Sequence, residues 1–419
     1  MIAEYGTIYL VLAVILGLYM TWGIGANDVA NAMGTSIGSG AITFKQAIII
    51  AAVLEFAGAF LAGGHVTNTI RKGIIDPTPI IDQPELLIWG MLAALMAAGV
   101  WLMVASYFGW PVSTTHSIVG ALVGFAVVGI GSDAVQWGKI GAIVMSWILS
   151  PLIGGVFAFL VMMSIQRFIL SAENPVKSAK RYAPFYIFLV GFIISLVTFF
   201  KGLKHLNLNL TIPQSFLAAV VIGALAAFIG KYYITKMSIK DPNDRGAQQH
   251  QIEKIFGLLQ IFSACAMAFA HGSNDVANGI GPMAAVVSIV QSSGEVAQKS
   301  TVPLWILAVG GFGIIIGLAT LGYRVIQTIG TKITELVPTR GFSAELAAAA
   351  TVVLASRTGI PVSTTHIAVG AVMGVGMARG IGALDVRVIG GIFLSWIVTL
   401  PVGAILSIVF FYIFRGIFL

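Results

Sequence analysis

Long apolar runs dominate the chain, and their lengths predict its secondary structure. A run of about 20 apolar residues is typical of a membrane-spanning helix, and twelve such runs can be traced along the sequence. Several contain glycine, proline or clustered polar residues, which favours broken or re-entrant half-helices there. We therefore expect an all-α polytopic membrane protein with about twelve transmembrane helices. The runs lie near residues 5–24, 45–64, 85–107, 112–130, 139–167, 184–203, 213–235, 252–270, 302–323, 342–357, 361–378 and 386–414.

Three landmarks occur twice, in the same order, in the two halves of the chain. The segment Gly25–Asn31 (GANDVAN) returns as Gly272–Asn278 (GSNDVAN), and PVSTTH at 111–116 returns unchanged at 361–366. A Ser-Trp pair ahead of a proline follows each copy of the second motif. The sequence therefore predicts two transmembrane repeats, at 1–168 and 252–419, joined at 169–251 by two non-repeated spans and a cytoplasmic linker.

Composition agrees with a membrane protein and excludes a water-soluble globule. Hydrophobic residues make up 58% of the 419 positions and charged residues 9%, against about 25% charged residues in soluble domains. The single cysteine, Cys265, cannot form an internal disulfide. No nucleotide-binding loop of the form GxxxxGKS or GxxxxGKT occurs, which argues against ATP-driven pumping.

Basic residues gather in three loops and predict the orientation of the spans. The positive-inside rule places these loops in the cytoplasm, and the net charge of +7 therefore needs no nucleic-acid partner. Counting spans from these loops places both termini outside the cell membrane and makes the second repeat inverted relative to the first. Inverted repeats are typical of secondary transporters. The three clusters are Arg167, Lys177, Lys180 and Arg181; Lys231, Lys236, Lys240, Arg245 and Lys254; and Arg324, Lys332 and Arg340.

The first repeated motif places an aspartate in each half, Asp28 and Asp275, at the end of or within an apolar run. A carboxylate at membrane depth costs about 2.5–3.5 kcal/mol on insertion scales, so it needs a compensating partner. Hard oxygen ligands suit sodium better than zinc or copper, and unwinding at Gly25 or Gly272 would add carbonyl oxygens. The alternative is a kink with an interhelical hydrogen bond. The candidate sodium ligands are Asp28, Asn31, Asp275 and Asn278, with Asn27 and Asn274 as further coupling candidates.

The second repeated motif favours an anion site in each half. A helix N-terminus carries about half a positive charge and unpaired N–H groups, and hydroxyl side chains there add donors. Two inverted copies facing each other would form a cradle for a tetrahedral oxyanion. The alternative is serines and threonines that bond back to carbonyls one turn earlier. The candidate anion-binding residues are Ser113, Thr114, Thr115, Ser363, Thr364 and Thr365.

Charge arithmetic links the two motifs. A divalent oxyanion such as phosphate with Asp28 and Asp275 sums to about −4, against about +1 from two helix ends, which leaves about −3. The monovalent form leaves about −2. Burying the remainder without compensation would be prohibitive. Two or three cations should therefore travel with each anion, which is symport.

Three other polar residues in the apolar runs leave more than one interpretation. Glu55 has no evident counterpart in the second repeat, and either takes part in ion coupling or pairs with a neighbouring helix. His116 and His366 more often form local hydrogen bonds than bind a metal at such positions, so sodium is the only metal ion that we expect.

At these motifs the sequence resembles the PiT family of inorganic phosphate transporters, over nearly the whole chain. The resemblance implies phosphate uptake by cation symport, with sodium coupling in some members and proton or metal-phosphate coupling in others, while some relatives carry sulfate. Carried over by position, it implies phosphate at Ser113–Thr115 and Ser363–Thr365, and cations at the aspartates and asparagines named above.

The primary hypothesis is a sodium–phosphate symporter that works by alternating access in the lipid bilayer of the cell membrane. It needs no cofactor, and phosphate and sodium are its substrates. The alternatives are a proton- or metal-phosphate symporter, a sulfate permease, a passive anion channel, or an intramembrane hydrolase that uses the aspartates and histidines. The paired, matching polar residues argue against an enzyme, because catalysis needs unlike groups in unlike roles. A homodimer is plausible for a carrier that needs a fixed scaffold.

Overall fold

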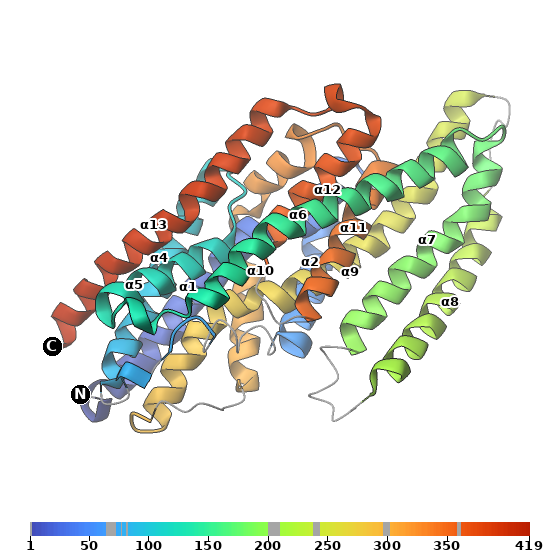
Figure 1. Ribbon diagram of the computed structural model, residues 1–419. Helices are drawn as coiled ribbons and strands as arrows, with labels where there is room; N and C mark the ends of the chain where they lie inside the picture. Colours follow the sequence, from blue (N-terminus) through green and yellow to red (C-terminus); the bar gives the residue numbers. More distant parts are fainter. Residues whose placement is uncertain are drawn as a thin grey trace.

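The computed structural model describes residues 2–63, 73–76, 78–80, 83–199, 210–237, 244–295, 302–357 and 362–419. Within these ranges the chain is helical, and the β-pairing among them is one bridge between Ile75 and Val135. Pro361 of the second PVSTTH copy and Lys240 of the second basic cluster lie outside the described residues. The expected all-α fold is confirmed (Figure 1).

Each of the twelve predicted runs overlaps an α-helix, although several helix ends differ from the predicted ones. The first repeat contains α1 (Ile2–Gly38), α2 (Phe44–Ala62), α4 (Pro84–Phe108), α5 (Thr114–Gly129) and α6 (Trp137–Ile165). The middle segment contains α7 (Pro175–Val197) and α8 (Ile212–Lys236). The second repeat contains α9 (Arg245–Gln291), α10 (Leu304–Gln327), α11 (Pro338–Arg357), α12 (Thr364–Arg379) and α13 (Val386–Phe418). Short 3-10 or π turns are η1 (Thr78–Ile80), η2 (Ser132–Ala134), η3 (Gln166–Leu170), η6 (Thr328–Lys332) and η7 (Ile381–Ala383).

Not every helix is a full membrane span. Nine helices in the described part of the chain are long and apolar enough to cross a bilayer, and α5, α11 and α12 are not among them. With 16 residues each, α5 and α12 reach about 24 Å at 1.5 Å per residue, less than the roughly 30 Å hydrocarbon core. Helix α4 ends at Phe108 shortly before α5 begins, and α11 ends at Arg357 shortly before α12 begins. The expectation of half-helices holds for the short helices α5 and α12.

The expected unwinding at Gly25 and Gly272 is wrong. Helix α1 runs unbroken through the first GxNDVAN motif, and α9 runs unbroken through the second. The two glycines serve close helix crossings instead: a Cβ added to Gly25 would overlap the carbonyl oxygen of Ile314, and one added to Gly272 would overlap that of Glu55. Because both helices keep their backbone hydrogen bonds, the motif carbonyls are not released as ligands.

The two repeats interlock rather than pack as separate units. Helix α1 packs on α10 of the other repeat, and α9 packs on α2. In the same way, α5 packs on α13 and α12 on α6, while α1 and α9 cross each other at the centre. The predicted repeat boundaries after residues 168 and 251 fall inside η3 and α9, and the division into repeats stays a prediction.

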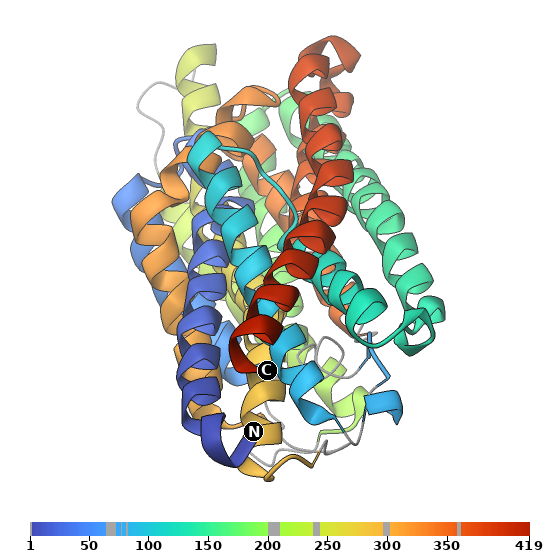
Figure 2. The ribbon, with the colours of Figure 1, turned by 90° about the vertical axis from the view of Figure 1, so that its left-hand side faces the viewer.

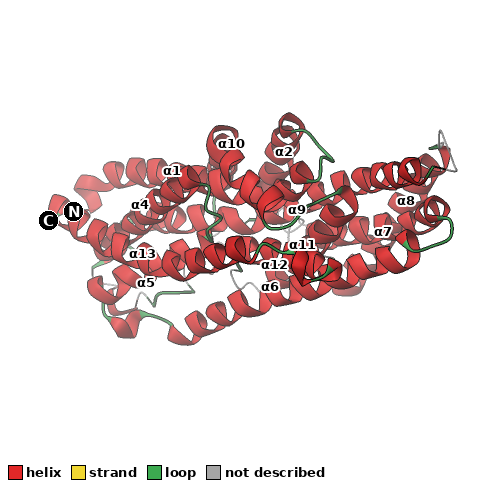
Figure 3. Cartoon of the chain, turned by 90° about the horizontal axis from the view of Figure 1, so that it is seen from above, coloured by secondary structure: helices red, strands yellow, loops and turns green. Residues whose placement is uncertain are grey.

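Helices α7 and α8 form a hairpin at one edge of the molecule, where α7 contacts α9 (Figures 1 and 3). The two termini lie together at the opposite end (Figure 2), and the rings of Tyr5 and Phe418 are 5.5 Å apart. The chain therefore starts and ends on the same side. That this side is extracellular stays a prediction, as does the inversion of the repeats.

Candidate functional site

The N-termini of α5 and α12 lie close to each other. Ser113 caps α5 and Ser363 caps α12, and each serine Oγ accepts a hydrogen bond, 3.2 Å long, from the backbone N–H of the histidine three residues on. Thr115 donates to the carbonyl of Val362, and Thr365 donates to that of Val112, both at 3.1 Å. These reciprocal contacts join the start of each helix to the residues just before the other.

The first threonine of each motif contacts the aspartate of its own repeat. Thr114 Oγ1 donates to Asp28 Oδ2 at 2.6 Å, and Thr364 Oγ1 donates to Asp275 Oδ2 at 2.6 Å. Such short hydrogen bonds to a carboxylate are stronger than those between neutral groups. The predicted anion-binding and cation-binding residues therefore lie in one cluster.

The asparagines of the first motif cross to the other repeat. Asn31 donates to Thr365 at 2.9 Å, and Asn278 donates to Thr115 at 3.2 Å and Thr114 at 3.1 Å. The buried Oδ1 of Asn31 has no hydrogen-bond partner, which leaves an oxygen of the type that sodium takes close to Asp28 on the same helix face.

This acidic centre is shielded from solvent and lacks basic side chains. Asp28 is 1% exposed, Asp275 is 0% exposed, and the motif threonines are 1% exposed. Among the described residues, no lysine or arginine is buried. An anion bound here would meet helix N-termini and hydroxyls, and any compensating positive charge must come from a cation or from histidine.

Asn27 and Asn274, the further coupling candidates, differ in their contacts. The Asn27 amide donates to Ser106 Oγ at 3.1 Å and to the Trp110 carbonyl at 2.9 Å, and its Oδ1 accepts from the Val112 N–H. Asn27 thus fixes the residues that connect α4 to α5 against α1. Asn274 donates to Asp275 Oδ1 at 2.6 Å and keeps a buried Oδ1 without a partner, so it remains a candidate at the ion centre.

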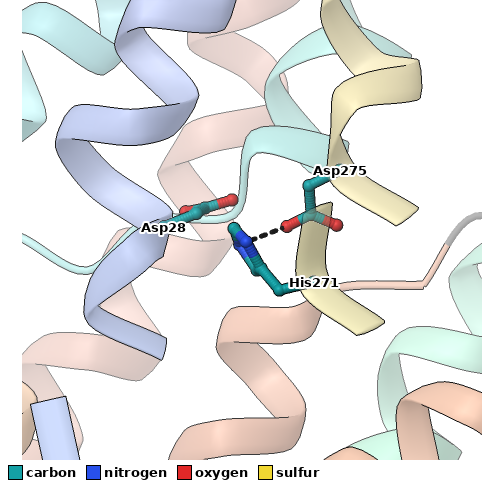
Figure 4. Close-up of side chains that lie close together, drawn as sticks. All are labelled: Asp28, His271 and Asp275. Carbon is teal, nitrogen blue, oxygen red and sulfur yellow. Dashed lines mark ion pairs between the residues drawn. The ribbon is translucent and has the colours of Figure 1, made fainter. Parts of the chain in front are cut away.

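Glu55 finds its partner in the second repeat, at a histidine that the sequence analysis missed. His271 Nδ1 lies 2.7 Å from Glu55 Oε2, and His271 Nε2 lies 2.9 Å from Asp275 Oδ2. Figure 4 shows His271 between Asp275 and Asp28, and ligand atoms of these three residues all lie within 4.8 Å of one another. The signal in the sequence was its place one helical turn before Asp275 on α9.

Glu345 of α11 is a second residue that the sequence analysis missed, and its contacts are with a different set of side chains. It is 1% exposed and accepts hydrogen bonds from Thr35 and Ser36 of α1 and, at 2.7 Å, from Ser263 of α9. This cluster ties together three helices that also carry or border the acidic centre. Its one hint in the sequence was a glutamate inside the predicted span 342–357.

His116 and His366 make tertiary rather than local side-chain contacts. His366 Nδ1 lies 3.1 Å from the carbonyl of Trp147, and His116 Nδ1 lies 3.4 Å from that of Trp396. Pro151 has no N–H to offer the Trp147 carbonyl in α6, which explains why that oxygen is available. Both histidines border an apolar cavity of about 800 Å³ between α6, α12 and α13.

Known proteins resemble this chain over nearly its whole length. The model of a family described as the phosphate transporter family matches residues 24–407. A Haemophilus influenzae protein classed as a phosphate permease is 48% identical, covering 100% of this chain and 99% of the relative. Inorganic phosphate transporter 2-1, chloroplastic, of Arabidopsis thaliana is 46% identical, covering 96% and 72%. A solved structure titled "The sodium-dependent phosphate transporter" has a TM-score of 0.89 and 41% identity, covering 98% and 99%.

Proposed function

This chain belongs to the phosphate transporter family, and from that premise we propose that it is a sodium-coupled symporter of inorganic phosphate that works by alternating access. The family consists of transporters, so the chain is a membrane transporter and the hydrolase hypothesis is set aside. The solved relative is named as sodium-dependent. The proposal for this chain rests mainly on the electrostatics of its own centre.

The observation that carries the proposal is a buried acidic centre between two helix N-termini. Asp28 and Asp275 have carboxylate oxygens within 4.8 Å, where two full negative charges repel by about 3.5 kcal/mol at an effective dielectric of 20. Phosphate would add more negative charge, and two helix ends return only about +1. Because no lysine or arginine among the described residues is buried, positive charge beyond what His271 can supply has to arrive with the substrate. Sodium suits the carboxylate, amide and hydroxyl oxygens present.

We assign phosphate to the two helix starts and sodium to the carboxylates beside them. Ser113, Thr114 and Thr115 with Ser363, Thr364 and Thr365 would offer hydroxyl donors and first-turn N–H groups. Asp28 with Asn31, and Asp275 with Asn278, would hold the cations. Thr114, Thr364 and Thr365 each contact both an aspartate and an asparagine, so filling one kind of site changes the partners of the other.

Alternating access is supported by the arrangement of the half-helices. Helices α5 and α12 begin beside each other and extend toward opposite ends of the molecule (Figure 1). This is the arrangement that inverted repeats would produce, with the substrate held between them. Helix α12 packs on α6, and α5 packs on α13. A change in how closely these two pairs pack would then open the acidic centre to one side of the membrane or to the other.

Uptake of labelled phosphate into proteoliposomes tests the proposal. We expect concentrative, saturable uptake when sodium is higher outside, and loss of concentration when choline replaces sodium at constant pH. Uptake that follows a pH gradient and ignores sodium would replace sodium with proton coupling. Competition by sulfate at equal concentration would shift the substrate assignment, and non-saturable flux without accumulation would indicate a channel.

A further inference from the structure

Most of the hydrogen bonds that join the motif aspartates and asparagines to the motif threonines follow a two-fold pattern, and the residue one turn before the aspartate departs from it. Adding 247 to a residue number in the first GxNDVAN motif gives its counterpart in the second, so Asp28 matches Asp275 and Asn31 matches Asn278. Their threonine contacts match as well. By the same offset, His271 matches Ile24. The residue that contacts Asp275 is therefore replaced by an alkyl group beside Asp28.

Glu55, the partner of His271, is also replaced by an alkyl residue where α1 crosses α10, the contact that matches the crossing of α9 and α2. Gly272 of α9 closely approaches the backbone of Glu55 in α2, and the matching Gly25 of α1 closely approaches that of Ile314 in α10. Glu55 and Ile314 thus occupy equivalent positions. One crossing buries a Glu55–His271 pair, and the other has Ile314 and Ile24 in its place, which are 1% and 0% exposed.

The contacts of His271 place a ring nitrogen against Asp275. Nδ1 of His271 is hydrogen-bonded to Glu55 Oε2 at 2.7 Å, and Nε2 lies 2.9 Å from Asp275 Oδ2, within ion-pair distance, without a hydrogen-bond partner of its own. Asp275 Oδ2 also accepts a hydrogen bond from Thr364. A sodium ion at Asp275 therefore has to share that oxygen with Thr364 and the His271 ring, whereas Ile24 offers no polar contact at the matching place beside Asp28.

We propose that the Glu55–His271 pair makes the two cation positions inequivalent, so that sodium is held tightly at Asp28 and loosely at Asp275. The inference rests on the proposed sodium coupling and adds an order to it. A buried Oδ1 without a hydrogen-bond partner is available at both positions, from Asn31 beside Asp28 and from Asn274 beside Asp275, so the His271 contact is what distinguishes them. Sodium at Asp275 is then the last cation to bind and the first to leave, and His271 is a positioning residue for that step.

A paired exchange tests this assignment. The double variant Glu55→Ile with His271→Ile installs the isoleucines that the other repeat carries and removes the acidic and the basic side chain together. Two readouts are taken at one fixed pH: phosphate uptake against sodium concentration, and the sodium-dependent rise in melting temperature of the detergent-purified protein. The matched control is Ile24→Leu with Ile314→Leu at the equivalent crossing.

We expect a broad, two-phase sodium dependence in the wild type and the control. In the double variant the weaker phase should shift to about threefold lower sodium or more, since the Asp275 carboxylate no longer shares Oδ2 with the His271 ring. If the isoleucine pair does not fold, Glu55→Gln with His271→Gln removes the same two ionisable groups with polar side chains and should shift the curve in the same direction. A double variant that folds and keeps the wild-type sodium curve overturns the inference alone. A wild type without sodium dependence overturns the proposed function instead.

Discussion

Removing the hydroxyl of Thr114 should weaken phosphate transport without disturbing the fold. Thr114 Oγ1 donates to Asp28 at 2.6 Å and accepts from Asn278 at 3.1 Å. Thr114→Val therefore removes the shorter of the threonine hydrogen bonds to Asp28 and one of the two that Asn278 donates to the motif threonines. Hydrogen bonds to charged groups contribute about 1.5–3 kcal/mol, and each 1.4 kcal/mol is about tenfold in affinity. The phosphate concentration for half-maximal uptake should therefore rise by about 10- to 150-fold.

The assay is labelled-phosphate uptake into proteoliposomes at saturating sodium, with the amount of inserted protein measured in each preparation. Thr114→Ser keeps the hydroxyl and is the matched control, which should stay within about threefold of the wild type because its hydrogen bond is retained. Thr364→Val makes the equivalent change beside Asp275 and should have an effect of similar size. Wild-type phosphate affinity in both valine variants would refute the placement of the anion at the two helix starts.

Two further predictions concern the aspartates and the helix crossings. Asp28→Asn and Asp275→Asn should each abolish sodium-coupled uptake, because each removes a carboxylate that the cations would neutralise; gradient-driven uptake at the wild-type rate in both would contradict the ion assignment. Gly25→Ala should lower the stability of the detergent-purified protein by about 1–3 kcal/mol, since its Cβ would overlap the backbone of α10. Gly138→Ala, where a Cβ meets no atom within 4 Å, is the control and should show no loss in a thermal unfolding assay.

The positions of the helices could be predicted from the sequence, but the full lengths of two of them could not. Apolar runs located all twelve helices because a bilayer imposes a minimum length of apolar surface. The same criterion ended the first run at residue 24, whereas α1 continues to Gly38. The polar residues of the motif are stabilised by partners on other helices, such as Thr114 for Asp28. A hydropathy pattern contains no information about such partners.

Repetition made most of the candidate site visible in the sequence. Two copies of each motif implied that aspartates and helix starts work together, and the structure places them within hydrogen-bonding distance. His271 escaped this reasoning because its counterpart, Ile24, gave no repeated signal. Its role depends on the contact between α2 and α9, and on Glu55, which lies 216 positions away in sequence.

The residues that break the repetition have a distinct consequence for a carrier. If the repeats are inverted, the inward-facing and outward-facing states exchange the environments of the two halves, and a fully symmetric centre would give both states the same energy. Only unmatched residues can make them differ. Glu55 and His271 are one unmatched set, and Glu345 with its hydroxyl donors is a second, because the offset of 250 between the PVSTTH copies places Leu95 at the equivalent position. In both sets ionisable side chains are buried in one repeat crossing, and the equivalent positions carry buried alkyl side chains. These alkyl residues are Ile24, Ile314 and Leu95. The preference of the empty and loaded carrier for one face should therefore respond to exchanges at these positions more than to changes at the matched threonines, which alter both states alike.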